Sequence, residues 1–310
     1  MEVCMSSKAT GSMMERRNTC TENIDKLSTE DMLATILQDD RAIADAIAVC
    51  LPDITRLVDN AIATLSRGGR LVIVGAGASG RAAMQAACEY APEAHHAVIG
   101  LIAGGADALL QAREAAASDY ERGINDLQTL DFNSNDMLLG LSVSGKTPWV
   151  WGALRYAGSL GATVATITQN AASEVAQLAD IVIAPQTGPE VVVGFANPKA
   201  RLAQRQILNM LSTALAVRTG RVYSNLRVDI NAADTHWAER QIAIVMEAAQ
   251  CPRAEAKRAL ESCNHSCRTA ILMLLTGLDA WHARDLLADN NEHLRMALQE
   301  AKGRTAMTTH

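Results

Sequence analysis

Aromatic side chains are scarce in this sequence of 310 residues. Phenylalanine, tryptophan and tyrosine together make up 3% of it, whereas hydrophobic residues make up 49% and charged residues 20%. The two larger fractions are ordinary for a globular protein, so the core must be built from aliphatic side chains. The length allows one large α/β domain and a smaller appendage.

An excess of positive charge is also missing. The formal net charge is −6, which gives no electrostatic footprint for nucleic acid. No apolar run approaches the roughly 18 residues that a membrane-spanning helix needs, and the N-terminus lacks the apolar stretch of a signal peptide. We therefore expect a cytoplasmic protein that binds neither nucleic acid nor a membrane.

The seven cysteines are scattered and odd in number. Without an export signal, they indicate reduced thiols rather than disulfides. Cys263 and Cys267 flank His265, a spacing that invites a metal site, but the segment has a helical pattern. One helix would place both sulfurs on one face and His265 away from it, and no second ligand pair is visible. We expect no metal at these residues.

A glycine-rich turn follows an apolar stretch near residue 70. Residues 71–74 predict a buried strand, Gly75, Gly77 and Gly80 interrupt it, and residues 81–90 predict a helix. Dinucleotide-binding folds share this spacing but need an acidic residue about 20 positions further on, and the next predicted strand carries none. The alternative is a turn that aims backbone N–H groups at a phosphate. Its candidate contacts are Ser79, Gly80 and Arg81.

A second turn of this kind follows the apolar residues 137–141. Hydroxyl side chains at three positions surround a glycine at the start of a predicted helix. One hydroxyl would suffice for an ordinary helix cap, so three of them favour a loop that wraps a phosphate, with the cap as the alternative. The candidate contacts are Ser142, Ser144, Gly145, Lys146 and Thr147.

Strands and helices alternate through the middle of the chain. Because the strands are continuous apolar runs, they indicate a parallel sheet that is covered on both faces. The predicted fold class is α/β, with a doubly wound, mostly parallel five-stranded sheet that binds ligands at the carboxyl ends of its strands. We expect strands near 71–74, 97–102, 137–142, 162–167 and 181–184, and helices near 81–90, 106–117, 148–159 and 171–178.

The parts of the chain before and after the strands are expected to contain helices only. Three precede it, up to about residue 66, and a long apolar-striped helix follows it at about 200–218. We predict a flexible N-terminal tail at 1–22, an α/β domain with its N-terminal helices at 23–232, and a small helical bundle at 236–302.

These motifs together resemble the sugar isomerase (SIS) domain family and, more closely, the N-acetylmuramic acid 6-phosphate etherases. The similarity spans roughly residue 15 to the C-terminus and includes the segments 75–81, 100–105, 144–148, 152–157, 188–192 and 208–213. The resemblance implies a SIS domain that binds a phosphorylated amino sugar and assembles as a homodimer. It also implies substrate contacts from Glu190 and from Lys199.

The family resemblance further implies a reaction. Etherases of this family remove the D-lactyl ether from the phosphosugar and release N-acetylglucosamine 6-phosphate and D-lactate, by elimination followed by hydration. Carboxyl groups move the protons, so no cofactor is required. Glu89 matches the position of the family's catalytic acid.

The chain departs from the family at its second catalytic glutamate. Ala117 stands there, and Glu114, Asp119 and Glu121 are nearby acids, of which Glu114 is the candidate substitute base. The late loop at 193–202 has also lost several hydroxyl groups and an arginine relative to the family pattern. Two hypotheses follow: an etherase or close sugar-phosphate lyase that uses Glu89, or a sugar-phosphate-binding regulator without turnover.

Overall fold

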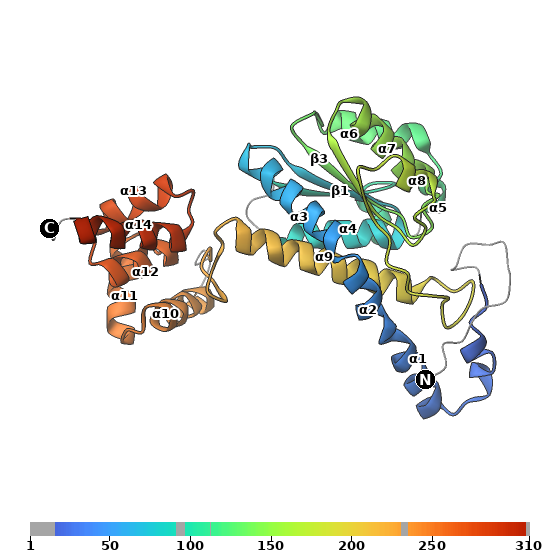
Figure 1. Cartoon of the computed structure of the whole chain (residues 1–310), viewed down its shortest axis with the longest axis horizontal. Coiled ribbons are helices and arrows are strands. Elements are labelled where there is room, and N and C mark those ends of the chain that lie inside the picture. The colour runs from blue at the N-terminus through green and yellow to red at the C-terminus, as the bar shows by residue number, and fades with distance from the viewer. Residues whose placement is uncertain (1–15, 91–96, 112, 231–234, 308–310) are drawn as a thin grey trace. The chain divides into compact units, whose positions relative to one another are not determined.

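The computed structural model describes residues 16–90, 97–111, 113–230 and 235–307. The chain forms two compact units, Met1–Thr213 and Ala214–His310 (Figure 1). Most of the expected tail, residues 1–15, lies outside the described residues. The domain limits drawn from the sequence stay a prediction.

A five-stranded parallel sheet forms the centre of the first unit. Its strand order is β2-β1-β3-β4-β5, and β1 and β3 are buried along their whole length, because their side chains are aliphatic and both faces are covered. The predicted fold class is confirmed. The strands are β1 (Leu71–Gly75), β2 (Val98–Ile102), β3 (Met137–Leu141), β4 (Thr163–Ile167) and β5 (Ile181–Ile183).

Helices cover both faces of this sheet. α4 packs on β1 and β2, whereas α6 and α7 pack together and α7 lies against β3 and β4 on the opposite face (Figure 1). Right-handed crossovers from a central pair of strands in two directions place the helices in this way. The bounds are α4 (Gly77–Tyr90), α6 (Tyr120–Thr129) and α7 (Pro148–Ser159).

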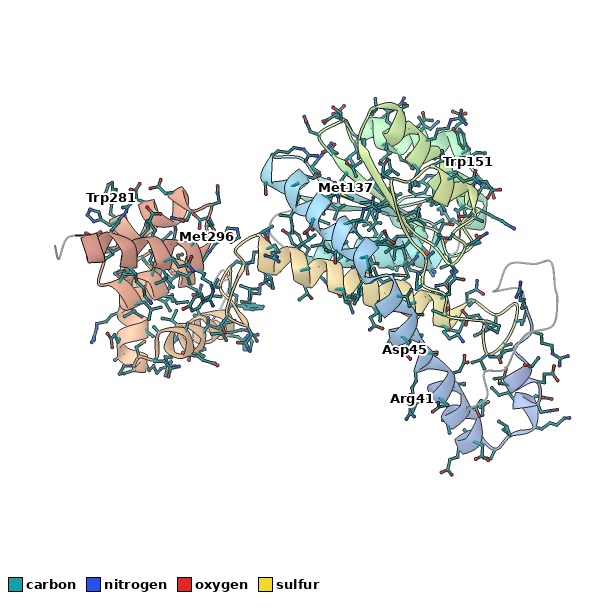
Figure 2. All side chains as sticks on the ribbon, in the orientation of Figure 1. Arg41, Asp45, Met137, Trp151, Trp281 and Met296 are labelled. Atoms are coloured by element: carbon teal, nitrogen blue, oxygen red, sulfur yellow. The ribbon has the colours of Figure 1, made fainter. Side chains whose placement is uncertain are left out.

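The three helices before the sheet match the expected ones. α3 lies against the sheet and buries Ile54, Leu57 and Ala61, whereas α1 buries none of its side chains. Arg41 and Asp45, which follow α1, point into solvent (Figure 2). The bounds are α1 (Thr29–Asp40), α2 (Ala42–Val49) and α3 (Leu51–Ser66).

The sequence misplaced two helices after β2 and missed a third. The expected helix at 106–117 is a 3-10 turn, η4 (Ala106–Leu109), followed by the short α5 (Glu114–Ala117). Its alanines favour a helix, but Ala108 is the one buried residue in η4 and Leu110 is 93% exposed, so little apolar surface is buried to stabilise a longer helix. The expected helix at 171–178 shortens to α8 (Glu174–Gln177), and α6 was not predicted at all.

The strands β1 and β3 are clamped together where they begin. The carboxylate of Asp136 accepts hydrogen bonds from the backbone N–H and the guanidinium of Arg70. Burial alone would raise the pKa of Asp136, but the hydrogen bonds from Arg70 and from the backbone N–H of Asn133 outweigh it and hold the pKa below its usual value. This ion pair fixes the register of β1 and β3, in which Leu71 pairs with Met137 and Gly75 pairs with Leu141. The two strands therefore end at the same height in the sheet.

The second unit consists of helices and a two-stranded hairpin. Its core is aliphatic, and Val245, Ala270 and Ile271 are fully buried, whereas Trp281 and Met296 point outward (Figure 2). The elements are β6 (Val222–Tyr223), β7 (Leu226–Arg227), α10 (Thr235–Ala249), α11 (Arg253–Ser262), α12 (Cys267–Thr276), α13 (Ala280–Asp289) and α14 (Leu294–Met307).

The single helix that the sequence pattern predicts across Cys263 and Cys267 is absent from the structure. Cys263 follows α11 and Cys267 begins α12, because Asn264 and His265 adopt left-handed backbone angles (φ 56° and 58°) that end α11. Burial raises the pKa of the Cys267 thiol to about 12, with Cys263 beside it adding to the shift. Across the described residues, no group of histidine, cysteine and acidic side chains could hold a metal.

Candidate functional site

The first glycine turn joins β1 to α4. Gly77 has a φ of +55°, and a Cβ on Gly80 would meet the side chain of Ile102 at 2.4 Å and the carbonyl oxygen of Gly75 at 2.6 Å. Only glycine fits at position 80, and it lets α4 begin directly beside the strand. Ser79 is buried in this first helical turn, next to backbone N–H groups that have no partner within the helix.

Arg81 is tied to a neighbouring element. Its Nη1 donates a hydrogen bond to the carbonyl oxygen of Ala108 in η4, at 3.1 Å. The side chain is otherwise exposed, so it connects the first turn to the segment that follows β2.

The second turn is shaped by its own hydroxyl groups. The Oγ of Ser142 is 2.9 Å from the Oγ1 of Thr147 and accepts a hydrogen bond from the backbone N–H of Gly145 at 3.1 Å. The backbone N–H of Lys146 donates to the Oγ of Ser144 at 3.3 Å. These contacts close the loop without a ligand.

Gly145 lets the second turn pack against the chain behind it. Its φ is +72°, and a Cβ there would meet the Oγ of Ser173 at 2.2 Å. Ser173 is itself fixed, because its Oγ accepts a hydrogen bond from the backbone N–H of Ala176 and caps α8. The position therefore requires glycine both for its backbone angle and for space.

The start of α7 lacks the ordinary cap. Thr147 is the N-cap residue, yet its side chain makes no capping hydrogen bond, because it contacts Ser142 instead. Pro148 occupies the first helical position. The N-terminal N–H groups of α7 thus have no side-chain acceptor from Thr147, and such groups attract an anion.

The two turns lie side by side. β1 and β3 are neighbours, and Gly75 pairs with Leu141 across them. The first turn follows Gly75 and the second follows Leu141, so Ser79 and Ser142 come from adjacent strand ends at the same edge of the sheet. This edge is the one at which open α/β sheets bind their ligands.

Glu89 lies in the last turn of α4. Nη2 of Arg205 donates to its Oε1 at 2.7 Å and to its Oε2 at 2.8 Å, and Nε2 of Gln85 donates to Oε1 at 2.8 Å. The Glu89 side chain is 46% exposed and the Arg205 side chain 24%. Ten residues of α4 separate Glu89 from Ser79, which is about 15 Å along a helix axis.

The region of the missing glutamate lies around α5. Ala117 ends α5 and is partly buried; the backbone of Glu114 begins α5, but its side chain lies outside the described residues. The carboxylate of Asp119 caps α6 by accepting a hydrogen bond from the backbone N–H of Arg122. Glu121 is exposed in the first turn of α6.

Glu190 and Lys199, the two charged residues predicted to contact the substrate, are both buried. Glu190 is 1% exposed, and its carboxylate accepts hydrogen bonds from the backbone N–H groups of Lys199 and Ala200, both at 2.9 Å. Nζ of Lys199 donates to Oδ2 of Asp39 at 2.6 Å. Burial, with Asp39 beside it, raises the pKa of Asp40, and Lys199 partly offsets that rise.

These contacts fix the start of α9 (Pro198–Arg218). A carboxylate at a helix N-terminus satisfies unpaired N–H groups and complements the helix dipole. Glu190 therefore acts on α9 from within the fold, and Lys199 joins α9 to α1 through Asp39. Sequence motifs gave no signal for Asp39, Gln85 or Arg205.

Two cavities lie beside these elements in the described part of the first unit. One of about 490 Å³ is bordered by Gly104 and Gly105 after β2 and by Arg122 of α6; one of about 310 Å³ lies between Arg17 and the loop residue Val192. Among the described residues, no helix is long and apolar enough to cross a membrane.

Family models match two parts of the chain. Residues 53–158 match the glucokinase regulatory protein N-terminal SIS domain, and residues 120–214 match the SIS domain. Both stretches contain the second turn, and the first of them contains the glycine turn after β1.

Curated relatives match over nearly the whole length. The chain is 48% identical over 289 residues to an N-acetylmuramic acid 6-phosphate etherase of Klebsiella aerogenes, covering 92% of this chain and 96% of that protein. It is 46% identical to the protein of that name from Aliivibrio fischeri strain MJ11, covering 94% and 98%. The corresponding protein of Aeromonas hydrophila is 48% identical, covering 89% and 94%.

Proposed function

We propose, since the chain belongs to the family of N-acetylmuramic acid 6-phosphate etherases, that it removes the D-lactyl ether from N-acetylmuramic acid 6-phosphate. It is a carbon–oxygen lyase of amino-sugar recycling. The products are N-acetylglucosamine 6-phosphate and D-lactate. We propose that the reaction takes place in the cytoplasm.

The observation that carries the proposal is the pair of turns at one sheet edge. Ser79 and Ser142 follow adjacent strands, and the N-termini of α4 and α7 begin there. A sugar phosphate bound at this edge would accept hydrogen bonds from backbone N–H groups and from the hydroxyls of both turns. Its contacts are Ser79, Gly80, Arg81, Ser142, Ser144, Gly145, Lys146 and Thr147.

The chemistry at the sugar needs a base and an acid. In the open-chain form, the aldehyde makes the C2 proton acidic, and a base removes it while the C3–O bond to lactate breaks. Glu89 is the acid that protonates the leaving lactyl oxygen. Glu114 is the substitute base, because Ala117 has no titratable group.

The distance along α4 implies a second subunit. The sugar carbons that react lie only a few bonds from the phosphate, whereas Glu89 is about 15 Å along the helix from Ser79. Glu89 therefore serves a sugar that is bound at the turns of a partner subunit, and the protein is a homodimer. Exposed apolar side chains on α1 and the late loop, such as Leu33, Leu37 and Phe195, supply surface for such an interface.

Release of D-lactate from N-acetylmuramic acid 6-phosphate tests the proposed reaction. We expect an enzyme-dependent release that stops when the phosphate is removed from the substrate. Phosphorylated amino sugars should also raise the melting temperature, and their unphosphorylated forms should not. Binding of the phosphosugar without any lactate would identify a sugar-phosphate-binding protein instead.

Subunit mixing tests the shared site. Light scattering should give a mass near twice 33.1 kDa. Glu89→Gln and Gly145→Ala subunits, each inactive alone, should recover activity when unfolded and refolded together, because the mixed dimer contains one complete site. Melting curves check that both variants fold; if both fold and activity does not recover, Glu89 acts within its own subunit.

A further inference from the structure

The carboxylate of Glu89 is held by a residue that is far away in the sequence. Arg205, which is 116 positions later, places one nitrogen, Nη2, between the two oxygens at 2.7 and 2.8 Å. Gln85, one helical turn earlier, donates to Oε1 only. The carboxylate is therefore fixed from two sides, by its own helix and by α9.

Counting hydrogen bonds singles out one oxygen of this carboxylate. A carboxylate has about four lone-pair directions, two on each oxygen. Within the described residues, Oε1 accepts from both Arg205 and Gln85, whereas Oε2 accepts from Arg205 alone. Among these contacts, one lone-pair direction on Oε2 has no donor and can carry a proton.

Arg205 is well placed to impose this arrangement. It lies on α9 among buried neighbours, Ala203, Ile207 and Leu208, which anchor that stretch of helix in the first unit. The carboxylate of Glu190 fixes the start of the same helix. The guanidinium thus approaches Glu89 from a rigid element, as a positioning group requires.

We propose that Arg205 is a positioning residue that holds Glu89 so that Oε2 carries the proton for the leaving group. The inference rests on the proposed etherase function. As the C3–O bond breaks, its electron pair stays on the lactyl oxygen, which takes the proton from Oε2. The C2 proton goes to the base, and its bonding electrons form the C2–C3 double bond. The guanidinium then offsets the negative charge that Glu89 acquires.

The first test compares kcat and KM for lactate release. Arg205→Ala should lower kcat about 10–100-fold, because a displaced acid loses its alignment, and should leave KM within about threefold. Arg205→Lys should fall between that variant and wild type, since lysine keeps a positive charge and N–H donors but lacks the fixed planar orientation of the guanidinium. Arg155→Ala, which removes an exposed arginine from α7, is the matched control and should keep wild-type kcat.

Two further measurements separate positioning from a structural role. Guanidinium ion added to Arg205→Ala should restore part of kcat, and should not activate wild type or Glu89→Gln. In the double variant Glu89→Gln/Arg205→Ala, the second change should add no further loss, because Arg205 acts through Glu89. Melting curves show whether each variant folds. If Arg205→Ala does not fold, the kcat of Arg205→Lys is compared with that of wild type instead.

The outcomes distinguish this inference from the function on which it rests. The positioning role would be wrong if wild type is active and Arg205→Ala keeps the wild-type kcat. It would also be wrong if Arg205→Ala raises only KM. Either result would leave the etherase function intact. A folded wild type that releases no lactate would overturn the function and this inference with it.

Discussion

The two ends of the candidate site are held in different ways. The second turn is closed by contacts between near neighbours: Ser142 to Thr147 spans five positions, and Gly145 to Ser142 spans three. Glu89 depends on Arg205, which is 116 positions away. The backbone oxygen of Gly145 also accepts a hydrogen bond from the N–H of Val175, 30 positions later. The phosphate turns are thus held by contacts over fairly short stretches of the chain, whereas Glu89 is held by a contact between elements that are distant in the sequence. Changes in distant parts of the chain should disturb the second end and spare the first.

The largest effect should come from Glu89→Gln, which removes the acid but keeps the shape. The amide cannot transfer a proton, so kcat for lactate release should fall about 10²–10⁴-fold. Affinity for inorganic phosphate should not change, because the turns at the strand ends are untouched. If Glu89→Gln releases lactate at the wild-type rate, Glu89 is not the acid of the reaction.

Ala117→Glu should act in the opposite direction. If the missing carboxylate limits the reaction, restoring it should raise kcat by about tenfold or more, with about 10²–10⁴ as the ceiling for one positioned base. An unchanged rate would mean that a substitute such as Glu114 already supplies the base. Glu114→Gln should then reduce kcat, and Glu121→Gln, an exposed neighbour in α6, is the control.

Ser142→Ala tests the local end. It removes the oxygen that accepts the N–H of Gly145 and contacts Thr147, which is worth about 1–2 kcal/mol and a factor of about 5–30 in affinity. KM for the phosphosugar should rise by about that factor while kcat changes little. A fall in kcat alone would show that the two ends are coupled.

The smallest effect is expected from Arg205→Ala on phosphate binding. Because the turns close through their own contacts, the dissociation constant of inorganic phosphate should change less than about twofold, measured by calorimetry. A larger change would break the separation between the two ends, even if kcat falls as expected.

The same division explains what could be predicted from the sequence. Strands and turns follow from local patterns, so β1, β3 and their glycine turns were predicted within a residue or two. Helix α6 was missed, although Asp119 gives it a side-chain cap. The expected helix at 106–117 broke, because its length depends on a buried face that composition does not reveal.

The contacts of the charged residues could not be predicted. The carboxylate of Glu190, a predicted substrate contact, accepts hydrogen bonds from two backbone N–H groups of α9. Lys199 is joined to Asp39, 160 positions earlier. Such pairs depend on which elements the fold brings together, and no spacing in a single sequence encodes that. Whether either residue also contacts substrate stays a prediction.

Helix α9 also limits how the gene can be shortened. The two units meet between Thr213 and Ala214, inside a helix that continues to Arg218. A stop codon at 214 would end the chain in mid-helix and leave up to about four carbonyl groups without their intrahelical partners. Gly220, with a φ of +74°, is a left-handed residue of the kind that ends helices. A truncated version that stops there would keep the whole of α9, the helix that carries Arg205, with its last turn intact.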